Sequence, residues 1–382
     1  MTKPSKQEIF FMLEEFLKEN YVFRFNNLLD QIEFKPANAE CKFKPLNKRA
    51  FASISVAAIK AGIPTTAQDV KLILESDVTP DSDPINDWLN SLPEWDGKDR
   101  IDALAAKIPT KCTYWNRIFH LWFLGMVAGW MQKNPDQGNS IVPVLIGAQG
   151  CGKSTFCRNI LPLQFHFAYA ESLNMNNKIE SERSLGRFLL INLDEFDQIT
   201  KNRQGWLKNI LQAPSVKIRK LFSNNIQEIR RYASFIATTN QSEIFYDQTG
   251  NRRYAPVEIT GLIDTESEID YEQLYAQALA ELKNGEPYWM SKEDEKMLEQ
   301  FNKEHLVMSA AMQAFSQHFR RPEAGETGVW LTPSDMISQL NAKSHSRIDP
   351  KQCSLLGKEL KGLGFECKRR TLGQYYHVAI AG

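Results

Sequence analysis

The stretch that decides the fold of this 382-residue chain is Gly147-Ala148-Gln149-Gly150-Cys151-Gly152-Lys153-Ser154-Thr155. It fits the pattern G-x-x-x-x-G-K-[ST], in which a glycine-rich turn binds the phosphates of a nucleotide. The apolar run Ile141–Ile146 before it predicts a buried strand, and Phe156–Leu161 after it predicts a helix that ends at Pro162. A turn between a strand and a helix is the context that this motif requires.

Each part of the motif has a physical role. Glycines allow backbone N–H groups to turn toward the phosphates, and the helix N-terminus adds its positive dipole end. Lys153 can reach the β- and γ-phosphates, and the Ser154 hydroxyl can bind Mg²⁺. ATP and Mg²⁺ are therefore the expected cofactors, with nucleotide contacts from Gly147, Gly150, Cys151, Gly152, Lys153, Ser154 and Thr155. A glycine-rich turn without a ligand is the alternative.

Composition limits the class of protein. Apolar content of 42% and charged content of 24% are ordinary for a globular protein, and the formal net charge is zero, so any basic surface for nucleic acid must be local. The six cysteines form no C-x-x-C pair, which favours a reducing, cytoplasmic compartment. The N-terminus has no signal-peptide pattern, and the apolar stretch Ile118–Met131 is too short to cross a membrane.

The pattern along the chain predicts five segments. Residues 1–77 form a small α+β module, 84–139 a helical segment, 140–290 a P-loop ATPase core, 291–324 a helical connector and 325–382 a winged-helix-like domain. Strand, loop and helix alternate between residues 140 and 259, which predicts the α/β core of a P-loop NTPase. The turn-rich stretch 77–84 is expected to be a linker.

A second strand, Phe188–Leu193, ends in two carboxylates. Asp194 is expected to bind the Mg²⁺ shell, and Glu195 to polarise the attacking water. A buried strand that ends at an acidic turn is the alternative.

A third strand, Phe235–Thr239, ends in Asn240, which we expect to orient the lytic water or contact the γ-phosphate. The turn that follows carries Arg252 and Arg253, which suit a finger inserted into the nucleotide site of a neighbouring subunit. Arg252 is the favoured finger and Arg253 the structural partner. An ordinary strand-end turn and a solvated basic turn are the alternatives.

Residues 84–290 resemble the virulence-associated protein E family, P-loop ATPases of phages, genomic islands and conjugative elements. The resemblance rests on Trp95-Asp96-Gly97 with Arg100-Ile101, the P-loop, Asp194-Glu195, Thr239-Asn240, Asp247 with Thr249-Gly250-Asn251-Arg252-Arg253, and Gly285-Glu286-Pro287-Tyr288-Trp289. The family is similar to superfamily 3 helicases and AAA+ ATPases, which implies a ring, hexameric or similar, that acts on DNA during replication of a mobile element. Many relatives carry an upstream primase domain, but Asp81-Ser82-Asp83 is expected to be a linker turn and no primase activity is predicted.

Two regions are candidates for contact with single-stranded, forked or duplex DNA. Lys217-Ile218-Arg219-Lys220, Phe222 and Arg230-Arg231 can face the channel of a ring, although an exposed basic strand pair shows the same pattern. The stretch from Val329 to Gly382 reads helix, helix, hairpin and carries eight basic and four acidic residues, which favours a duplex reader or a protein-docking wing.

The leading hypothesis is an ATP-hydrolysing, ring-forming DNA motor or remodeller, with helicase as the expected activity, that serves replication of a phage, genomic island or conjugative element and does not associate with a membrane. The second is a nucleotide-switched regulatory or defence ATPase that unwinds nothing. A small-molecule kinase is the third.

Overall fold

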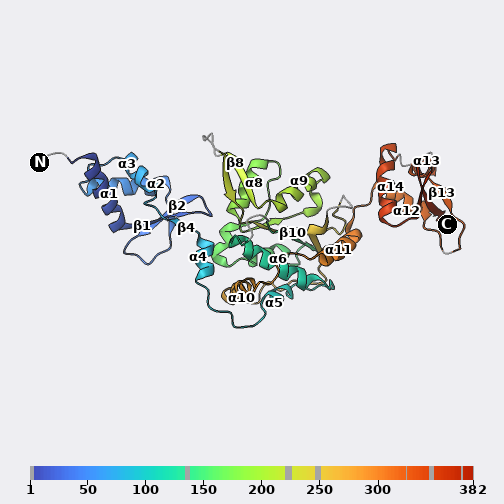
Figure 1. Cartoon of the computed structure of the whole chain (residues 1–382), viewed down its shortest axis with the longest axis horizontal. Helices are drawn as coiled ribbons and strands as arrows, with labels where there is room; N and C mark the ends of the chain where they lie inside the picture. Colours follow the sequence, from blue (N-terminus) through green and yellow to red (C-terminus); the bar gives the residue numbers. More distant parts are fainter. Residues whose placement is uncertain are drawn as a thin grey trace.

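The computed structural model describes residues 4–133, 138–219, 226–245, 251–323, 325–343, 348–370 and 373–381. Figure 1 shows three units in a row: an N-terminal unit, a central unit built on a sheet, and a C-terminal unit joined to the centre by one segment of chain. Among the described residues, no helix is both long and apolar enough to cross a membrane. All six cysteines are free thiols.

The N-terminal unit packs three helices on a four-stranded sheet of order β3-β2-β1-β4. Its core contains Leu13, Leu17, Ile54 and Val70, which recur on one side of each helix. The expected linker is in part a strand, because Asp81 and Ser82 pair in parallel with β1. Its elements are α1 (Lys6–Asn20), β1 (Tyr21–Asn26), β2 (Gln31–Pro36), β3 (Lys44–Pro45), α2 (Lys48–Lys60), α3 (Ala67–Leu74) and β4 (Asp81–Ser82).

The central unit contains a five-stranded sheet of order β11-β5-β10-β7-β6, in which every pairing is parallel. Parallel strands are covered by helices on both faces, which explains why their sequences read as continuous apolar runs. The strands are β5 (Val142–Ile146), β6 (Tyr169–Ala170), β7 (Leu190–Leu193), β10 (Ser234–Thr239) and β11 (Tyr254–Glu258). The mixed α/β architecture with an all-parallel sheet is the one expected of a P-loop NTPase.

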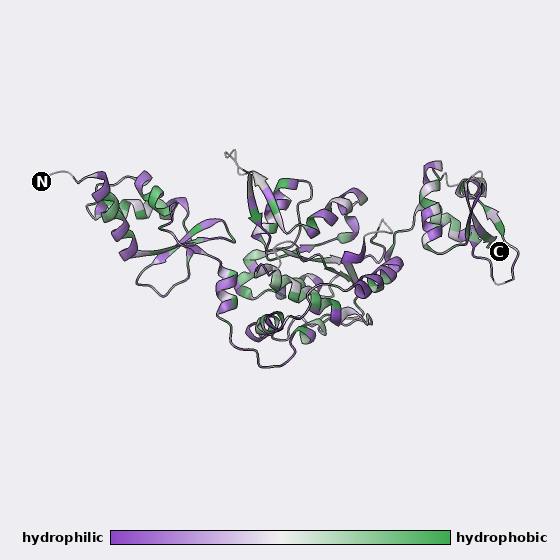
Figure 2. Ribbon diagram, in the orientation of Figure 1, coloured by the Kyte–Doolittle hydropathy of each residue, from purple (hydrophilic) through white to green (hydrophobic). Residues whose placement is uncertain are grey.

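Two hydrophobic cores occupy the two faces of the sheet. Alternate strand residues supply them: Leu145 and Ile236 point to one face, and Val144 and Phe235 to the other. The first face is covered mainly by α6 (Trp115–Trp130), α7 (Lys153–Asn159) and α10 (Tyr271–Asn284), and the second by α8 (Lys178–Arg187) and α9 (Lys201–Gln212). Helix α6 is buried on most sides, which accounts for its largely apolar sequence from Leu121 to Trp130 (Figure 2).

The remaining elements of the central unit surround this sheet. They are α4 (Pro84–Asn90), α5 (Ile101–Ala105), η1 (Leu163–Ala168), η2 (Phe196–Gln198), β8 (Ser215–Arg219), β9 (Ile226–Arg230), η3 (Asn251–Arg253), α11 (Lys292–Phe301) and η4 (Asn302–His305). Strands β8 and β9 form a separate antiparallel hairpin.

The Trp95-Asp96-Gly97 stretch fastens the segment before the sheet onto α10. Asp96 accepts two hydrogen bonds from the Arg100 guanidinium, at 2.6 and 2.9 Å, and Arg100 also contacts Asp270 at 3.1 Å. The Trp95 indole donates to the Lys98 carbonyl at 2.9 Å. These bonds close a tight loop, and Gly97 supplies the left-handed backbone (φ +85°) that the loop requires.

The C-terminal unit has the order helix, two short strands, helix, helix, hairpin. It comprises α12 (Ala310–His318), β12 (Phe319–Arg320), β13 (Val329–Leu331), α13 (Pro333–Lys343), η5 (Pro350–Gln352), α14 (Cys353–Gly362), β14 (Cys367–Arg370) and β15 (Gly373–Ile380). The sequence placed α12 in a continuous helical connector before residue 325. Instead the chain breaks after η4, and Phe315 of α12 packs into the C-terminal core, because its apolar side belongs to that unit.

Candidate nucleotide-binding site

The glycine-rich turn joins β5 to α7 at the carboxyl edge of the sheet. Gly150 (φ +79°) and Gly152 (φ +98°) both adopt the left-handed conformation, which a side chain would strain. A Cβ on Gly152 would lie 3.1 Å from the Thr265 side chain, so the turn is also closely packed from outside. Ser154 and Thr155 are exposed on the first turn of α7. The predicted strand, loop and helix are therefore all present in order.

Lys153 is folded back over the turn and is only 8% exposed. Its ammonium group donates to the Gly147 carbonyl at 2.7 Å, the Ala148 carbonyl at 2.8 Å and Asn240 Oδ1 at 2.9 Å. An ammonium has three protons, so these three oxygens satisfy it fully. The contact with Asn240 arises because β10 lies next to β5 in the sheet, with Thr239 opposite Ile146.

The carboxylates predicted to serve Mg²⁺ and water follow β7 at the same edge. Asp194 is exposed and accepts a hydrogen bond from the Thr238 hydroxyl at 2.5 Å through one oxygen. Glu195 is exposed in the left-handed region (φ +51°), which turns the chain sharply away from the strand. Hydroxyl and carboxylate oxygens are the ligands that Mg²⁺ prefers, so Ser154 and Asp194 fit this ion in chemistry and accessibility.

The sequence alone assigned no role to Asp197, and it named Thr239 only as the end of a strand and as part of the family resemblance. Asp197 of η2 accepts a hydrogen bond from the Thr239 hydroxyl at 2.5 Å. Thr239 also accepts the backbone N–H of Gln241 at 3.0 Å, so both groups fix the turn that carries Asn240. The sequence does show an acidic residue, Asp197, two positions after Glu195. Its partner Thr239 lies 42 residues further along the chain, and only the order of the strands brings the two side chains together.

Arg252 and Arg253 lie at the opposite edge of the sheet from the P-loop. They immediately precede β11, whose first residue Tyr254 pairs with Val142, the first residue of β5. Five residues of strand separate that end from Gly147, about 16 Å at about 3.3 Å per residue. Neither arginine therefore meets the P-loop of its own chain. Asp247, Thr249 and Gly250 of the same turn lie outside the described residues.

The two arginines differ in their surroundings. Arg252 is exposed, contacts Glu295 of α11 at 3.1 Å and borders a pocket that Tyr288 and Trp289 also line. Arg253 is half-buried, and burial together with the neighbouring Arg252 charge lowers its pKa.

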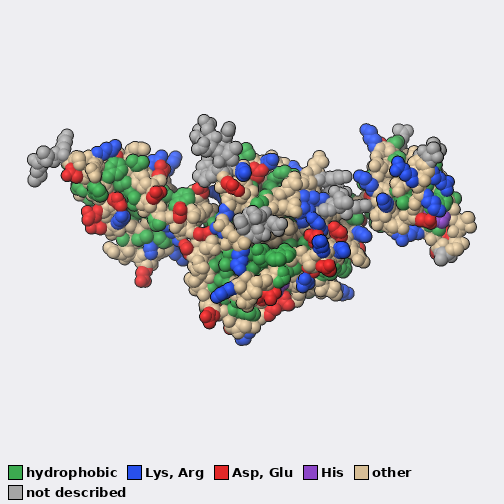
Figure 3. Space-filling model, viewed as in Figure 1, with side chains coloured by type: hydrophobic (Ala, Val, Ile, Leu, Met, Phe, Trp, Pro, Cys, Tyr) green, Lys and Arg blue, Asp and Glu red, His purple; other side chains and the backbone are tan. Residues whose placement is uncertain are grey.

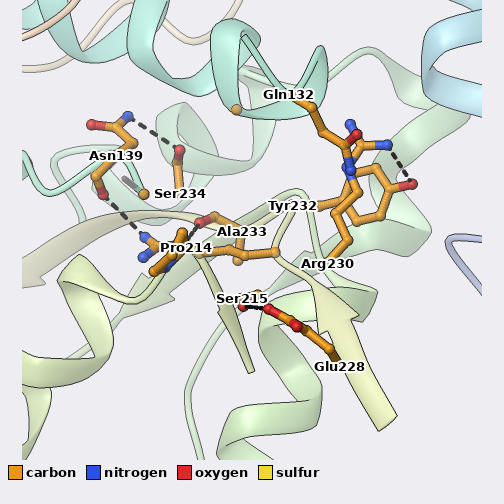
Figure 4. Close-up of a pocket in the computed structure, with 12 residues that line it drawn as sticks. Gln132, Asn139, Pro214, Ser215, Glu228, Arg230, Tyr232, Ala233 and Ser234 are labelled. Carbon is orange, nitrogen blue, oxygen red and sulfur yellow. Dashed lines mark hydrogen bonds between the residues drawn. The ribbon is translucent and has the colours of Figure 1, made fainter. Parts of the chain in front are cut away.

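The basic hairpin predicted to face nucleic acid is only partly described. Lys217 is exposed on β8, whereas Lys220 and Phe222 lie outside the described residues and the Arg219 side chain is not described. A pocket of about 330 Å³ lies at the root of this hairpin (Figure 4). Figure 4 shows Arg230 directed at Tyr232 along one wall of this pocket.

The expectation that Arg230 and Arg231 contact nucleic acid is wrong for Arg231. Its buried guanidinium donates at 2.7–3.1 Å to five carbonyl oxygens, those of Ala233, Ile210, Leu211, Ala213 and Asn139. Two of these carbonyls end α9, where the negative end of the helix dipole favours a cation. Arg230 binds Asp83 at 2.8 Å and the Trp130 carbonyl, so both residues fasten the hairpin root to the rest of the chain.

Comparison with known proteins adds the following findings. Residues 89–307, more than half of the chain, match the virulence-associated protein E-like domain, and residues 308–378 match DUF3874, a domain of unknown function from B. theta. Comparison with the curated proteins gives no match.

Solved structures of low similarity were also found. The apo structure of the NrS-1 C terminal region has 12% identity and a TM-score of 0.47, with 99% of this chain and 100% of that chain covered. Its A form apo structure has 12% identity and a TM-score of 0.45, with 98% and 100% covered. A further A form apo structure has 13% identity and a TM-score of 0.45, with 97% and 99% covered. These likenesses are too weak to carry an argument about function.

Proposed function

The chain belongs to the virulence-associated protein E-like family, and we propose that it is an ATP-hydrolysing, ring-forming DNA motor or remodeller that serves replication of a mobile element. The proposal combines the family membership with the arrangement of polar groups along one edge of the sheet. The ring is proposed to be a hexamer or similar assembly, with single-stranded or forked DNA as the partner of the ATPase core.

In this proposal the groups at the carboxyl edge of the sheet act on the triphosphate. The P-loop glycines direct N–H groups at the phosphates, and Lys153 exchanges its three present acceptors for phosphate oxygens. Ser154 and Asp194 hold Mg²⁺, which when bound neutralises charge on the phosphates. Glu195 accepts a proton from the attacking water, and Asn240 orients that water.

The observation that carries the proposal is the placement of the arginines. Arg252 and Arg253 do not reach the site at the carboxyl edge in their own chain, since they lie about 16 Å away at the amino edge of the sheet. An exposed arginine there can complete the site of a neighbouring subunit and stabilise charge on the transferring phosphoryl group. Its contact with Glu295 orients the guanidinium without burying it. ATP would then be held by one subunit and hydrolysed with help from the next.

Mixing two inactive variants tests this arrangement. Lys153→Ala removes the P-loop lysine, and Arg252→Ala removes the proposed finger, so each alone is expected to lose ATPase activity by roughly 10³-fold or more. In a one-to-one mixture, about one quarter of randomly formed interfaces combine an intact P-loop with an intact arginine. ATPase activity of the mixture should therefore recover toward a quarter of the wild-type rate.

The matched control is Arg320→Ala, which removes an exposed arginine paired with Glu326 at 2.7 Å, much as Arg252 is paired with Glu295. It is expected to change the rate by less than about twofold. A mixture that stays inactive, or an Arg252→Ala chain with full activity, contradicts a site shared by two subunits. Arg253→Ala is measured in parallel, because the two arginines are adjacent.

A strand-displacement assay on forked DNA tests whether the protein acts as a DNA motor. The proposal requires ATPase activity that rises with forked or single-stranded DNA, and displacement that stops in Lys153→Ala. If DNA does not change the ATPase rate and no strand is displaced, the result favours a nucleotide-switched regulator instead.

A further inference from the structure

The C-terminal sheet presents one face that the helices of its unit do not cover. Strand β15 is central, with β13 on one side and β14 on the other. Tyr376 and Val378 are buried in the core, so the alternate residues of β15 point outward. We call this outward surface the wing face: Trp330 of β13, Lys368 and Arg370 of β14, and Tyr375 and His377 of β15.

Aromatic rings hold the two cations of the wing face in place. Lys368 Nζ lies 4.3 Å from the centre of the Trp330 ring, and Arg370 lies 5.9 Å from the same ring and 5.1 Å from that of Tyr375. The opposing His377 ring stacks on Trp330 at 4.8 Å with an angle of 9°. Cation–π contacts reduce the freedom of long side chains, so two positive charges are presented to solvent in a fixed place.

Most acidic residues of the unit are engaged away from these two cations, and Glu366 offsets part of the charge of Lys368 alone. Asp335 caps α13 by accepting the Thr332 N–H and hydroxyl, Asp349 caps η5, and Glu359 accepts the N–H and hydroxyl of Ser309. Among the described acidic residues from 329 onward, Glu366 lies beside the wing face, 3.6 Å from Lys368 and 3.5 Å from His377. Figure 3 accordingly shows Lys and Arg side chains gathered over this unit.

The contacts of the Trp330 and Tyr375 rings favour duplex over single-stranded nucleic acid as the ligand of the wing face. Proteins that bind single strands offer open aromatic rings on which bases stack. Here the Trp330 ring contacts His377, Lys368 and Arg370, and the Tyr375 ring contacts Arg370. The faces of both rings therefore hold side chains of the same unit and are not open to a stacking base. Oriented cations without open rings suit the dense phosphates of a duplex backbone.

We propose that the wing face binds the phosphate backbone of duplex DNA, independently of sequence and of ATP. The contact supplies the chain with a second DNA site, separate from the single-stranded or forked DNA proposed for the ATPase core. It places a duplex against the C-terminal unit while the core acts on another part of the same DNA. The domain of unknown function at residues 308–378 would thereby be a duplex-holding module.

Fluorescence anisotropy of the full chain without ATP tests the proposal, with a labelled random-sequence duplex of about 20 base pairs and the matching single strand. The variant Lys368→Ala/Arg370→Ala is expected to bind the duplex at least tenfold more weakly near physiological salt. The slope of log affinity against log salt should fall by about two, one for each lost phosphate contact. Lys368→Arg/Arg370→Lys keeps both charges and should retain most of the affinity.

The matched control is Lys358→Ala/Lys361→Ala, which removes two exposed lysines of α14 and the same total charge. Equal duplex affinity and salt slope in the wing-face variant overturn the proposal, as does a loss confined to the single strand. A loss seen only in the α14 variant assigns the duplex to that helix instead. Thermal unfolding confirms that each variant is folded, and unchanged ATPase activity without DNA separates failure here from failure of the proposed ATPase site.

Discussion

Lys153 and Asn240, 87 positions apart in the sequence, are joined by a 2.9 Å hydrogen bond across the carboxyl edge of the sheet. The bond links the P-loop to the end of β10, so the position of the amide depends on what the ammonium binds. Phosphate oxygens that take over the lysine would release Asn240 for a water molecule.

We expect Asn240→Ala to lower kcat at least tenfold while changing ATP affinity by only a few-fold, because the proposal assigns the amide to the reacting water and phosphate binding to Lys153. Steady-state ATPase kinetics and binding of a fluorescent ATP analogue measure the two effects. Gln241→Ala, which removes the adjacent exposed amide, is the control and should be near wild type. Equal losses in binding and turnover would assign Asn240 to ground-state phosphate binding.

Glu195→Gln should abolish turnover, roughly 10²-fold or more, and leave ATP binding intact, because an amide cannot accept the proton from water. Asp197→Asn keeps an oxygen for the Thr239 hydroxyl and should cost only a few-fold. Single-turnover hydrolysis compares them. The assignment of the general base fails if the Glu195 variant hydrolyses ATP faster than the Asp197 variant.

Gly152→Ala should weaken nucleotide binding and destabilise the core by about 1–2 kcal/mol, since a side chain at φ +98° is strained. The new Cβ would also meet Thr265 at 3.1 Å. Gly205→Ala in α9 is the control: its Cβ meets nothing within 4 Å, and helix propensity predicts a gain of about 0.5–1 kcal/mol. Denaturant unfolding with and without ATP analogue measures both.

Arg231→Met should destabilise the central unit by about 3 kcal/mol or more, because five backbone carbonyls, three of them in buried hydrogen bonds, lose their donor. Burial lowers the pKa of Arg231 to about 10, so the side chain stays charged at neutral pH. Arg231→Lys retains the positive charge and some of the hydrogen bonds, so its stability should lie between those of the wild type and Arg231→Met. Urea unfolding followed by circular dichroism ranks the stabilities of the three proteins. A wild-type midpoint in Arg231→Met would show that the hydrogen bonds of Arg231 to the five carbonyls contribute nothing to stability.

The contact between His120 and Glu281 is expected to contribute to the free energy of unfolding in a pH-dependent way. Its Nε2 lies 2.6 Å from Glu281, and this hydrogen bond raises the His120 pKa, with Asp102 and Asp99 adding smaller effects in the same direction and partial burial opposing them. Because the folded pKa is raised, the contribution is fully present below the unfolded value of about 6.5 and is lost as pH rises through the folded value.

The expected size of this contribution is about 1 kcal/mol after allowance for solvent screening. His120→Gln should therefore lower the thermal midpoint more at pH 5.5 than at pH 9, relative to wild type at each pH. A difference between the two proteins that is constant with pH would contradict the assignment, and Glu281→Gln should flatten the wild-type profile.

Local patterns predicted the P-loop turn, the apolar strands of the sheet and a helix directly after the turn. The glycines and Lys153 could be placed in this turn because the motif spans only a few neighbouring residues of the sequence. The Lys153–Asn240 and Asp197–Thr239 contacts could not, since both depend on β10 lying between β5 and β7, an order that no local pattern encodes.

The misreading of Arg231 has a similar cause. Arg230 and Arg231 look alike in sequence as a basic pair after a strand, yet successive residues direct their side chains differently. Arg230 meets the carboxylate of Asp83, and Arg231 enters a set of backbone carbonyls that carries no sequence signal. The helix limit after residue 301 was missed because the charged stretch 291–317 favours helix throughout, while its apolar side chains serve two different cores.

The parallel sheet makes each copy of the chain directional, with the P-loop at one rim and Arg252 at the other. Two copies that meet through these rims cannot be related by a twofold axis, because unlike surfaces must face each other. Such contacts propagate head to tail and end only when the array closes on itself or runs out of subunits. A copy damaged at a single rim would therefore still accept a neighbour on its other side.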